Sequence, residues 1–367
     1  MSLALYRKYR PKTFAEVIGQ EYTVKILTNA IASGMISHAY LFTGPRGTGK
    51  TTMGRLLAKA VNCQNRKQGE GEPCNQCESC QEINKGNSID LIEIDAASNR
   101  GIDEMRELKE GIRFVPTKSK YKVFIIDECH QLTKEANNAL LKTLEEPPSH
   151  AIFVLATTEI YKMIPTIISR CQRFDFRKLR IEEIVKRLET ILKKEKIEYE
   201  EPALFLIARE ATGSIRDAES LLDKIISFSG KNQPIKKEMV KKLLGNVEIE
   251  LITQFVKYLS EKDAKKAVSF LNESIDKGVN LQQFIKALNS YLREILLLKI
   301  DSQFEDSLIS GLTAEEKEKI KEFAEKLSSE EIYQFLEKFM AAENKMKYSS
   351  IPQLPLELAI VEICQKK

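Results

Sequence analysis

Eight residues near the amino end, Gly44 to Thr51, constrain the fold of this chain more than any other stretch. They read GPRGTGKT and match the spacing G-x-x-x-x-G-K-[ST] in full. The apolar run AYLF precedes them, and the helical pattern TTMGRLLAKAV follows. A glycine-rich turn between a strand and a helix lets backbone N–H groups converge on phosphate oxygens at the positive end of the helix dipole. The sequence therefore predicts a phosphate-binding loop rather than a chance glycine turn.

The residues of this loop have distinct expected roles toward a bound ATP. Lys50 should neutralise the β- and γ-phosphates, and Thr51 should ligate Mg²⁺. Further contacts with the nucleotide are expected from the rest of the loop and the first turn of the helix, at Gly44, Gly47, Thr48, Gly49 and Thr52.

A second segment, KVFIIDECH, supplies two carboxylates at the end of an apolar run. Val123 to Ile126 predict a buried strand, and carboxylates at the carboxyl end of a parallel strand project into the crevice where ligands bind. Asp127 is expected to hold Mg²⁺ through water, and Glu128 is placed to polarise an attacking water as general base. The alternative is a solvated strand end, which the phosphate loop makes the weaker interpretation.

A further apolar strand, AIFVLATTE, ends in Thr157 and Thr158. Either hydroxyl could sense the γ-phosphate or position the water. Strands that end in threonine are common, so the spacing alone leaves this role open. We predict Thr157 as the catalytic candidate of the pair.

Four of the seven cysteines are clustered at the spacing C-x10-C-x2-C-x2-C, at Cys63, Cys74, Cys77 and Cys80. Four thiolates can close a tetrahedral zinc site. An iron–sulfur cluster and unligated loop cysteines are alternatives that the spacing does not exclude. Because four cysteines leave no open coordination position, the predicted zinc is structural.

The composition limits the class of protein. The 367-residue chain has a net charge of +4, with 43% hydrophobic and 30% charged residues. These values predict packed domains, and the mild basic bias tolerates a nucleic-acid partner without arguing for one. The sequence has no apolar run near the roughly 18 residues of a membrane span and no signal-peptide core at its amino end. We therefore expect a cytoplasmic protein without a membrane partner.

The order of the patterns predicts an α/β chain of three domains. The apolar runs HAYLFTG, DLIEID, YKVFIIDE and AIFVLATT alternate with helical patterns up to residue 178, which predicts a parallel sheet with helices on both faces. This nucleotide-binding domain (1–178) would carry a small zinc insert (63–80). The patterns are helical from 179 to 244, and a longer all-α region follows from 245 to 367.

Together these segments resemble the AAA+ ATPases of the clamp-loader group. SRC (Ser169 to Cys171) and GSIRDAESLLD (Gly213 to Asp223) follow the strand motifs in the order of that group. YRKYRPKTFAEVIGQE (Tyr6 to Glu21) is similar to its adenine-side segment. The cysteine insert and LLKTLEEPP (Leu140 to Pro148) narrow the resemblance to the gamma/tau subunits of bacterial DNA polymerase III. The match is nearly continuous as far as Leu244 and rests beyond it on length and helical character.

The resemblance implies a helical lid domain (179–244), a helical collar for oligomerisation (245–367) and additional site residues. Arg170 would be an arginine finger that reaches the γ-phosphate bound by a neighbouring subunit, and Arg216 would be a lid arginine acting on its own nucleotide. On the adenine side, the implied residues are Tyr6, Arg10 and Ile18. From the residues alone, Arg170 could also be a cation that ends a helix, and Arg216 is one of many helical arginines.

The resemblance also implies an inner surface that tracks DNA. The segment DAASNRGIDEMRELKEGIR places Ser98, Asn99 and Arg100 at a predicted helix start whose N–H groups could face phosphates. An ordinary solvated helix start is the alternative. The implied partners are further copies of the chain, the delta and delta prime subunits, a sliding clamp and primed DNA. The implied cofactors are ATP, Mg²⁺ and Zn²⁺.

These features favour an ATP-hydrolysing motor subunit that uses ATP to open a sliding clamp and load it onto primed DNA. A helicase is one alternative, since DECH resembles the signature of one helicase class, but the sequence shows no second motor domain after Leu244. A non-hydrolysing nucleotide switch or scaffold is another, although intact Lys50 and Glu128 speak against it. Tau forms carry a long tail, and the sequence here stops at Lys367, which fits a short form or a shortened chain.

Overall fold

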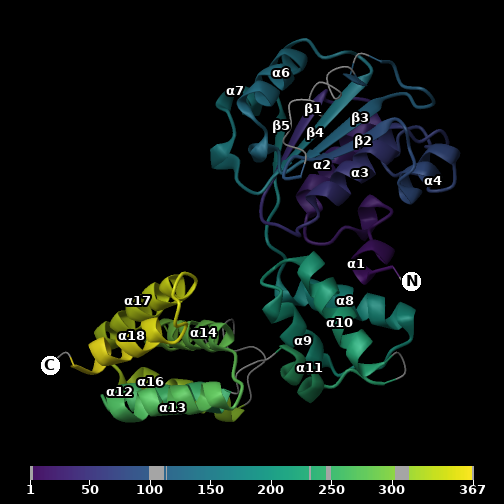
Figure 1. The fold of residues 1–367 in the computed structure, drawn as a ribbon. Coiled ribbons are helices and arrows are strands. Elements are labelled where there is room, and N and C mark those ends of the chain that lie inside the picture. The colour runs from purple at the N-terminus through teal and green to yellow at the C-terminus, as the bar shows by residue number, and fades with distance from the viewer. Residues whose placement is uncertain are drawn as a thin grey trace. The chain divides into compact units, whose positions relative to one another are not determined.

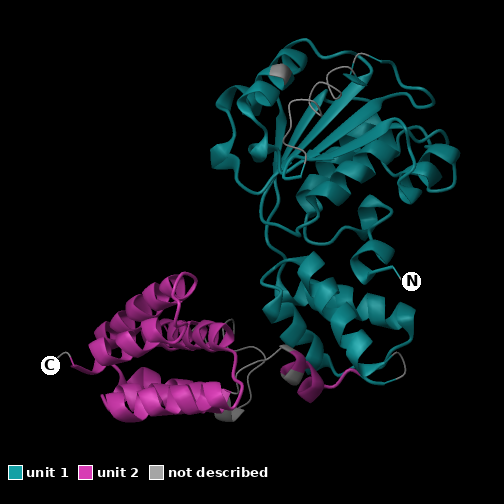
Figure 2. Cartoon of the chain, viewed as in Figure 1, with its two compact units in different colours: residues 1–234 teal, residues 235–367 magenta. Residues whose placement is uncertain are grey.

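The structure, a computed structural model, describes residues 3–98, 111–112, 114–230, 233–244, 249–301 and 314–365. The chain divides into two compact units, Met1–Pro234 and Ile235–Lys367 (Figure 2). The first holds a parallel sheet, its covering helices and a group of helices that follows the sheet in the chain (Figure 1). The second is helical over its described residues. The finer division at residues 178 and 244 stays a prediction.

A five-stranded parallel sheet forms the centre of the first unit, in the order β2-β3-β4-β1-β5 (Figure 1). Its strands are β1 (Ala39–Thr43), β2 (Leu91–Asp95), β3 (Lys122–Asp127), β4 (Ala151–Thr157) and β5 (Gln172–Asp175). The first four are the predicted apolar runs, so the predicted α/β class is confirmed. The edge strand β5 was not predicted, because its sequence QRFD has a single buried residue, Phe174, and no apolar run.

The helices of the first unit surround and follow this sheet. In chain order, with the short 3-10 turns written η, they are α1 (Leu5–Lys8), η1 (Phe14–Glu16), α2 (Glu21–Ser33), α3 (Lys50–Val61), α4 (Glu78–Lys85), η2 (Cys129–Gln131), α6 (Lys134–Glu145), η3 (Ile160–Lys162), α7 (Pro165–Ile168), α8 (Ile181–Glu195), α9 (Glu201–Glu210) and α10 (Ile215–Ser229).

Both faces of the sheet are buried, because alternate side chains of the central strands enter different cores. Tyr40 and Phe42 of β1 lie in one core with Leu27 of α2. Leu41, between them in sequence, lies in the other core with Leu140 of α6. Because both faces of the sheet are covered, these strands have continuous apolar sequences. Polar functional groups can therefore lie only at the strand ends.

The helices α8 and α10 are joined by a buried ion pair. Arg187 Nε on α8 donates to Glu219 Oε1 of α10 at 2.9 Å, and both side chains are buried. Arg187 also donates to the carbonyl oxygen of Tyr9, just after α1. The ion pair thus joins α8 to α10, and the hydrogen bond to Tyr9 ties the amino-terminal residues to α8. A buried charge that loses its partner is strongly destabilising.

The described helices of the second unit are α11 (Lys237–Leu244), α12 (Ile249–Ser260), α13 (Ala264–Asp276), α14 (Leu281–Ile300), α16 (Ala314–Lys326), α17 (Ser329–Met346) and α18 (Leu354–Gln365). Phe255 lies in the core formed by α12 to α18, with ring centroids 5.1 Å from Phe284 and 6.1 Å from Phe339. The helical pattern predicted for this region is thus found in its described residues. Among the described residues, none of the helices combines the length and apolar character needed to cross a bilayer.

Candidate nucleotide and metal sites

The predicted phosphate loop connects β1 to α3. Its glycines Gly44, Gly47 and Gly49 have φ values of 142°, 75° and 101°, which other residues rarely adopt. A Cβ on Gly44 would lie 2.2 Å from the carbonyl oxygen of Phe176. The loop therefore needs glycine both for its backbone path and for the close approach of its neighbour.

Lys50 begins α3, and its side chain reaches back over the loop. Its Nζ donates to the carbonyl oxygens of Gly44 at 2.7 Å and Pro45 at 2.8 Å. Burial lowers the pKa of Lys50, and the carboxylates of Glu128 and Asp127 oppose that shift. A buried ammonium held by neutral carbonyl groups can take a phosphate oxygen as a stronger, charge-assisted partner.

The expected magnesium ligands come from two elements and meet. Thr51 Oγ1 on α3 donates to Asp127 Oδ2 at the end of β3 at 2.6 Å. A hydroxyl and a carboxylate oxygen are the oxygen donors that Mg²⁺ prefers, so the pair fits that ion. Of the other predicted loop contacts, Thr48 donates to the Pro45 carbonyl oxygen at 2.9 Å, and Thr52 lies in the first turn of α3.

Glu128 follows Asp127 in a left-handed backbone conformation, with φ 48°. Such a conformation is uncommon outside glycine and occurs often at functional sites. Its Oε2 accepts hydrogen bonds from Thr158 Oγ1 at 2.8 Å and from Thr158 N at 3.2 Å. The carboxylate is thus held by the end of β4 and its following turn.

The structure gives the two threonines of LATTE different partners. Thr158, and not the predicted Thr157, contacts Glu128. Thr157 is buried, and its hydroxyl lies 2.9 Å from Nδ1 of His130 and accepts from the N–H of Glu159 at 3.0 Å. A strand places successive side chains on opposite faces, which separates these neighbours. The catalytic role assigned to Thr157 from the sequence stays a prediction.

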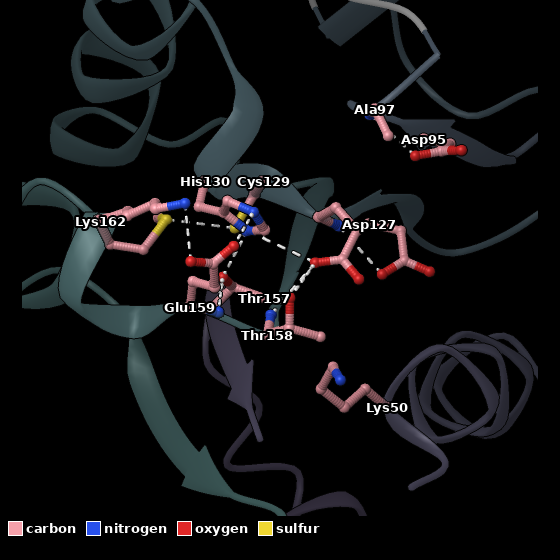
Figure 3. A network of polar contacts seen from close by, with 12 residues as sticks. Lys50, Asp95, Ala97, Asp127, Cys129, His130, Thr157, Thr158, Glu159 and Lys162 are labelled. Atoms are coloured by element: carbon pink, nitrogen blue, oxygen red, sulfur yellow. Dashed lines mark hydrogen bonds and ion pairs between the residues drawn. The ribbon is translucent and has the colours of Figure 1, made fainter. Parts of the chain in front are cut away.

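His130 is a member of the site that the sequence analysis missed. Its Nδ1 lies 3.4 Å from Glu128 Oε2, and its Nε2 lies 3.3 Å from Glu159 Oε1. Glu159 in turn pairs with Lys162 at 2.7 Å. Figure 3 shows this chain of polar contacts running from Lys162 toward the end of β3. The signal was present in DECH, two residues after Glu128.

The beginning of α10 contacts the phosphate loop. The Ile215 N–H donates to the Gly47 carbonyl oxygen at 3.1 Å, and a Cβ on Gly47 would lie 2.0 Å from Ser214 Oγ. The next residue, Arg216, has its guanidinium 5.2 Å from the ring centroid of Tyr6. The predicted lid arginine and a predicted adenine-side residue are therefore neighbours.

The other two predicted adenine-side residues, Arg10 and Ile18, are half-buried on the same amino-terminal stretch as Tyr6. Two residues after Ile18, Gln20 Nε2 donates to the carbonyl oxygen of Arg177 at 2.9 Å. Arg177 follows Phe176, whose carbonyl oxygen faces Gly44. This stretch thus contacts the residues after β5 that lie against the phosphate loop.

Arg170 lies away from the phosphate loop and has partners within the chain. One guanidinium nitrogen donates to Glu145 Oε1 at 2.7 Å, and another donates to the Thr166 carbonyl oxygen of α7 at 2.8 Å. Its side chain remains about one-third exposed, at 33%. The helix-ending contact of the alternative interpretation is therefore present, and the exposed part leaves the predicted role toward another subunit open to test.

The four clustered cysteines converge. The sulfur atoms of Cys63, Cys74, Cys77 and Cys80 all lie within 4.8 Å of one another. Burial raises the pKa of the Cys74 thiol, but the N–H donors of Gln76 and Cys77, together with the neighbouring thiols of Cys63 and Cys77, lower that pKa to about 6. Four sulfur atoms around a single ion at about 2.3 Å would be separated by about 3.8 Å. The cluster thus fits one tetrahedral metal ion.

The predicted DNA-facing residues are described only in part. Ser98 lies in the turn after β2, where its hydroxyl donates to Asp95 Oδ2 at 2.9 Å. Asn99 and Arg100 lie outside the described residues.

Comparison with known proteins agrees with this arrangement along the whole chain. Three family profiles match consecutive segments: DNA polymerase III, delta subunit, at residues 19–180; DNA polymerase III clamp loader subunit, ATPase lid domain, at 183–231; and DNA polymerase III subunits gamma and tau domain III, at 235–367.

Curated relatives include the DNA polymerase III subunit tau of Bacillus subtilis, which is 43% identical over 99% of this chain and 63% of its own length. The tau subunit of Escherichia coli is 36% identical over 97% of this chain and 54% of its own length. The chain thus spans less than two thirds of either tau subunit.

Other relatives have a length close to that of this chain. The DNA polymerase III subunit gamma of Buchnera aphidicola subsp. Schizaphis graminum is 39% identical over 98% of both chains. A solved Thermotoga maritima RuvB structure overlaps 68% of this chain and 78% of its own, at 21% identity and a TM-score of 0.49, which adds nothing to the assignment. The relatives and profiles together show that this chain belongs to the DNA polymerase III gamma and tau subunit family.

Proposed function

We propose that the chain is an ATP-hydrolysing motor subunit of a bacterial clamp loader, which acts in the cytoplasm and uses ATP to open a sliding clamp and load it onto primed DNA. The observation that carries this proposal is that Lys50, Thr51, Asp127 and Glu128 lie together at the carboxyl ends of the parallel strands. Open parallel sheets bind their ligands at these strand ends.

The chemistry of this edge follows from its residues. The loop amides and Lys50 would hold the phosphates, and Thr51 with Asp127 would hold Mg²⁺, which neutralises charge on the β- and γ-phosphates. Glu128 would accept a proton from the attacking water. Two hydrogen bonds from Thr158 hold the Glu128 carboxylate, so this threonine sets where the base points.

The proposal is tested by steady-state ATP hydrolysis of the chain assembled with delta, delta prime, the clamp and primed DNA. We expect clamp and primed DNA together to raise turnover above that of the assembly alone. Stimulation by single-stranded DNA without any clamp would indicate a helicase-type motor. Nucleotide binding without turnover would indicate a switch or scaffold, and either result would overturn the proposal.

The clustered cysteines are proposed to bind one structural Zn²⁺. Their sulfur atoms, within 4.8 Å of one another, leave room for a single ion but not for an iron–sulfur cluster, which places several metal atoms between its thiolates. The N–H groups of Gln76 and Cys77 point at Cys74 Sγ from 3.4 and 3.3 Å, and such donors stabilise a thiolate ligand.

Metal analysis of the purified chain is expected to find about one zinc per chain, because four thiolates fill one tetrahedral site. Cys74→Ser should reduce the zinc content and destabilise the insert, while Cys364→Ser, in the second unit, should leave it unchanged. Zinc well below one per chain in the absence of a chelator would contradict the assignment. So would an iron signal.

A further inference from the structure

A buried lysine joins the cysteine insert (residues 63–80) to the phosphate-loop helix. Lys59 lies on α3, and its side chain is buried. Its Nζ donates to the Lys12 carbonyl oxygen at 2.6 Å, to Asn75 Oδ1 at 2.6 Å and to Asn84 Oδ1 at 2.9 Å. An ammonium group has three donors, so all three are used. They link α3, the amino-terminal chain, the insert and α4 at one point.

The insert also contacts the amino-terminal segment (residues 12–31) through Glu72. The Glu72 carboxylate accepts from the N–H of Phe14 at 2.9 Å and from the N–H of Ala15 at 2.8 Å. These are the first N–H groups of η1, which lack partners within that turn. Hydrogen bonds from backbone N–H groups to a carboxylate are among the stronger ones in proteins, so this contact fixes where the segment turns.

Two further contacts place the insert against α2, the helix that ends this segment. A Cβ on Gly71 would lie 2.4 Å from the Thr28 carbonyl oxygen, so the two backbones are in direct contact. The Arg66 guanidinium donates to the Ile31 carbonyl oxygen at 3.2 Å, in the last turn of α2. The insert therefore touches the segment at η1 and again along α2.

The far side of the same segment faces the nucleotide site. The Gln20 side chain is hydrogen-bonded to the backbone of Arg177. Phe176, which precedes Arg177, packs its carbonyl oxygen against Gly44. Asp127 and Glu128 mark the γ-phosphate end of the site on the β3 and β4 side of β1, so the nucleoside is expected on the other side of the loop, toward β5 and Phe176, where this segment makes its contacts. A shift of the segment would change that side without moving Lys50 or Thr51.

We propose that the cysteine insert is a positioning module for nucleoside recognition, in which Lys59 and Glu72 fix the amino-terminal segment against the phosphate-loop helix. This rests on the proposed nucleotide and zinc sites. A centre of four thiolates and one Zn²⁺ carries a net negative charge, which complements the buried Lys59 cation. The insert thus contributes to the affinity for the nucleoside half of ATP and leaves the phosphate half to the loop.

The test compares two ligands that share the phosphates. Dissociation constants for ATP and for inorganic triphosphate are measured with the wild-type chain, Glu72→Gln, Lys59→Met and the control Glu70→Gln. Glu72→Gln removes the charge that the two N–H groups bind, so the dissociation constant for ATP should rise about tenfold, the scale of losing one such contact. The constant for triphosphate should stay within about twofold. Glu70 lies in the same insert with an exposed side chain, so its variant should match the wild type for both ligands.

Hydrogen exchange gives an independent readout. In Glu72→Gln the amides of Phe14 and Ala15 should exchange faster, while those of the phosphate loop keep the wild-type rate. Equal losses for ATP and triphosphate would show general destabilisation and overturn the proposal, as would an unchanged ATP affinity in a variant with faster exchange. If the wild-type chain fails to bind ATP, the proposed nucleotide site itself is wrong. Lys59→Met should reproduce the Glu72→Gln pattern if it folds, and the Glu72 variant decides the matter if it does not.

Discussion

Arg170→Ala is expected to bind ATP normally yet hydrolyse it about 10³ to 10⁵ times more slowly within an assembly, the range found when an arginine finger is lost. The sheet explains why this effect must act between chains. β1 and β5 are parallel with Tyr40 opposite Gln172, and Arg170 precedes β5, so it lies beyond the amino end of that strand. The phosphate loop begins at Gly44, four residues after Tyr40, or roughly 13 Å further along at the rise of a strand. Arg170 therefore lies far from the phosphates of its own chain.

Mixing two inactive variants tests this arrangement directly. Arg170→Ala chains keep an intact loop, and Lys50→Ala chains keep an intact arginine. A mixture should regain part of the activity wherever the two intact parts meet. Arg173→Ala is the matched control, because Arg173 is also exposed and pairs with Asp175 at 2.7 Å, so its loss should change turnover by less than about twofold. Full activity of Arg170→Ala, or no rescue on mixing, would leave Arg170 as the cation that ends α7 and pairs with Glu145.

Glu128→Gln is expected to lower ATP hydrolysis by at least ~10²-fold, the usual scale for losing a general base. The amide keeps the shape of the side chain and can still accept from Thr158, so the turn after β3 should remain in place. Nucleotide affinity should be retained, because Lys50, Thr51 and Asp127 are unchanged. Lys50→Ala should instead abolish binding.

The measurement combines nucleotide binding with single-turnover hydrolysis, so that affinity and chemistry are separated. Glu146→Gln is a suitable control, since it makes the same chemical change between α6 and the amino end of β4, whereas Glu128 follows the carboxyl end of β3. Turnover equal to that of the wild type in Glu128→Gln would mean that another group activates the water.

The sequence indicated the parts of the site that depend on local pattern and left out those that depend on tertiary contact. The phosphate loop and β1, β3 and β4 were readable because buried parallel strands need continuous apolar runs, and the loop needs glycine at fixed positions. β5 was missed because an edge strand with exposed side chains has no such run. Thr158 and His130 were not separated from their neighbours, because which side chain faces Glu128 depends on how β3 and β4 pair.

The cysteine insert shows the same division. The spacing of the thiolates predicted a site whose sulfur atoms do converge. Lys59, by contrast, reads in sequence as a solvent-facing residue of an amphipathic helix, since nothing nearby marks it as buried. Its partners, at Lys12, Asn75 and Asn84, are 47, 16 and 25 residues away along the chain. Contacts of that kind become visible only when the chain is folded.

The parallel pairing of β1 with β5 also restricts the symmetry of any assembly that uses Arg170 in this way. One chain would donate its arginine from the amino ends of the strands and receive its neighbour's at the carboxyl ends. Where these two surfaces contact different neighbours, the contacts are heterologous and repeat head to tail, so the chains form a ring or an open arc. In an open arc, one terminal chain would hold a nucleotide without a donated arginine, and the chain at the other end would present an arginine with no nucleotide to complete.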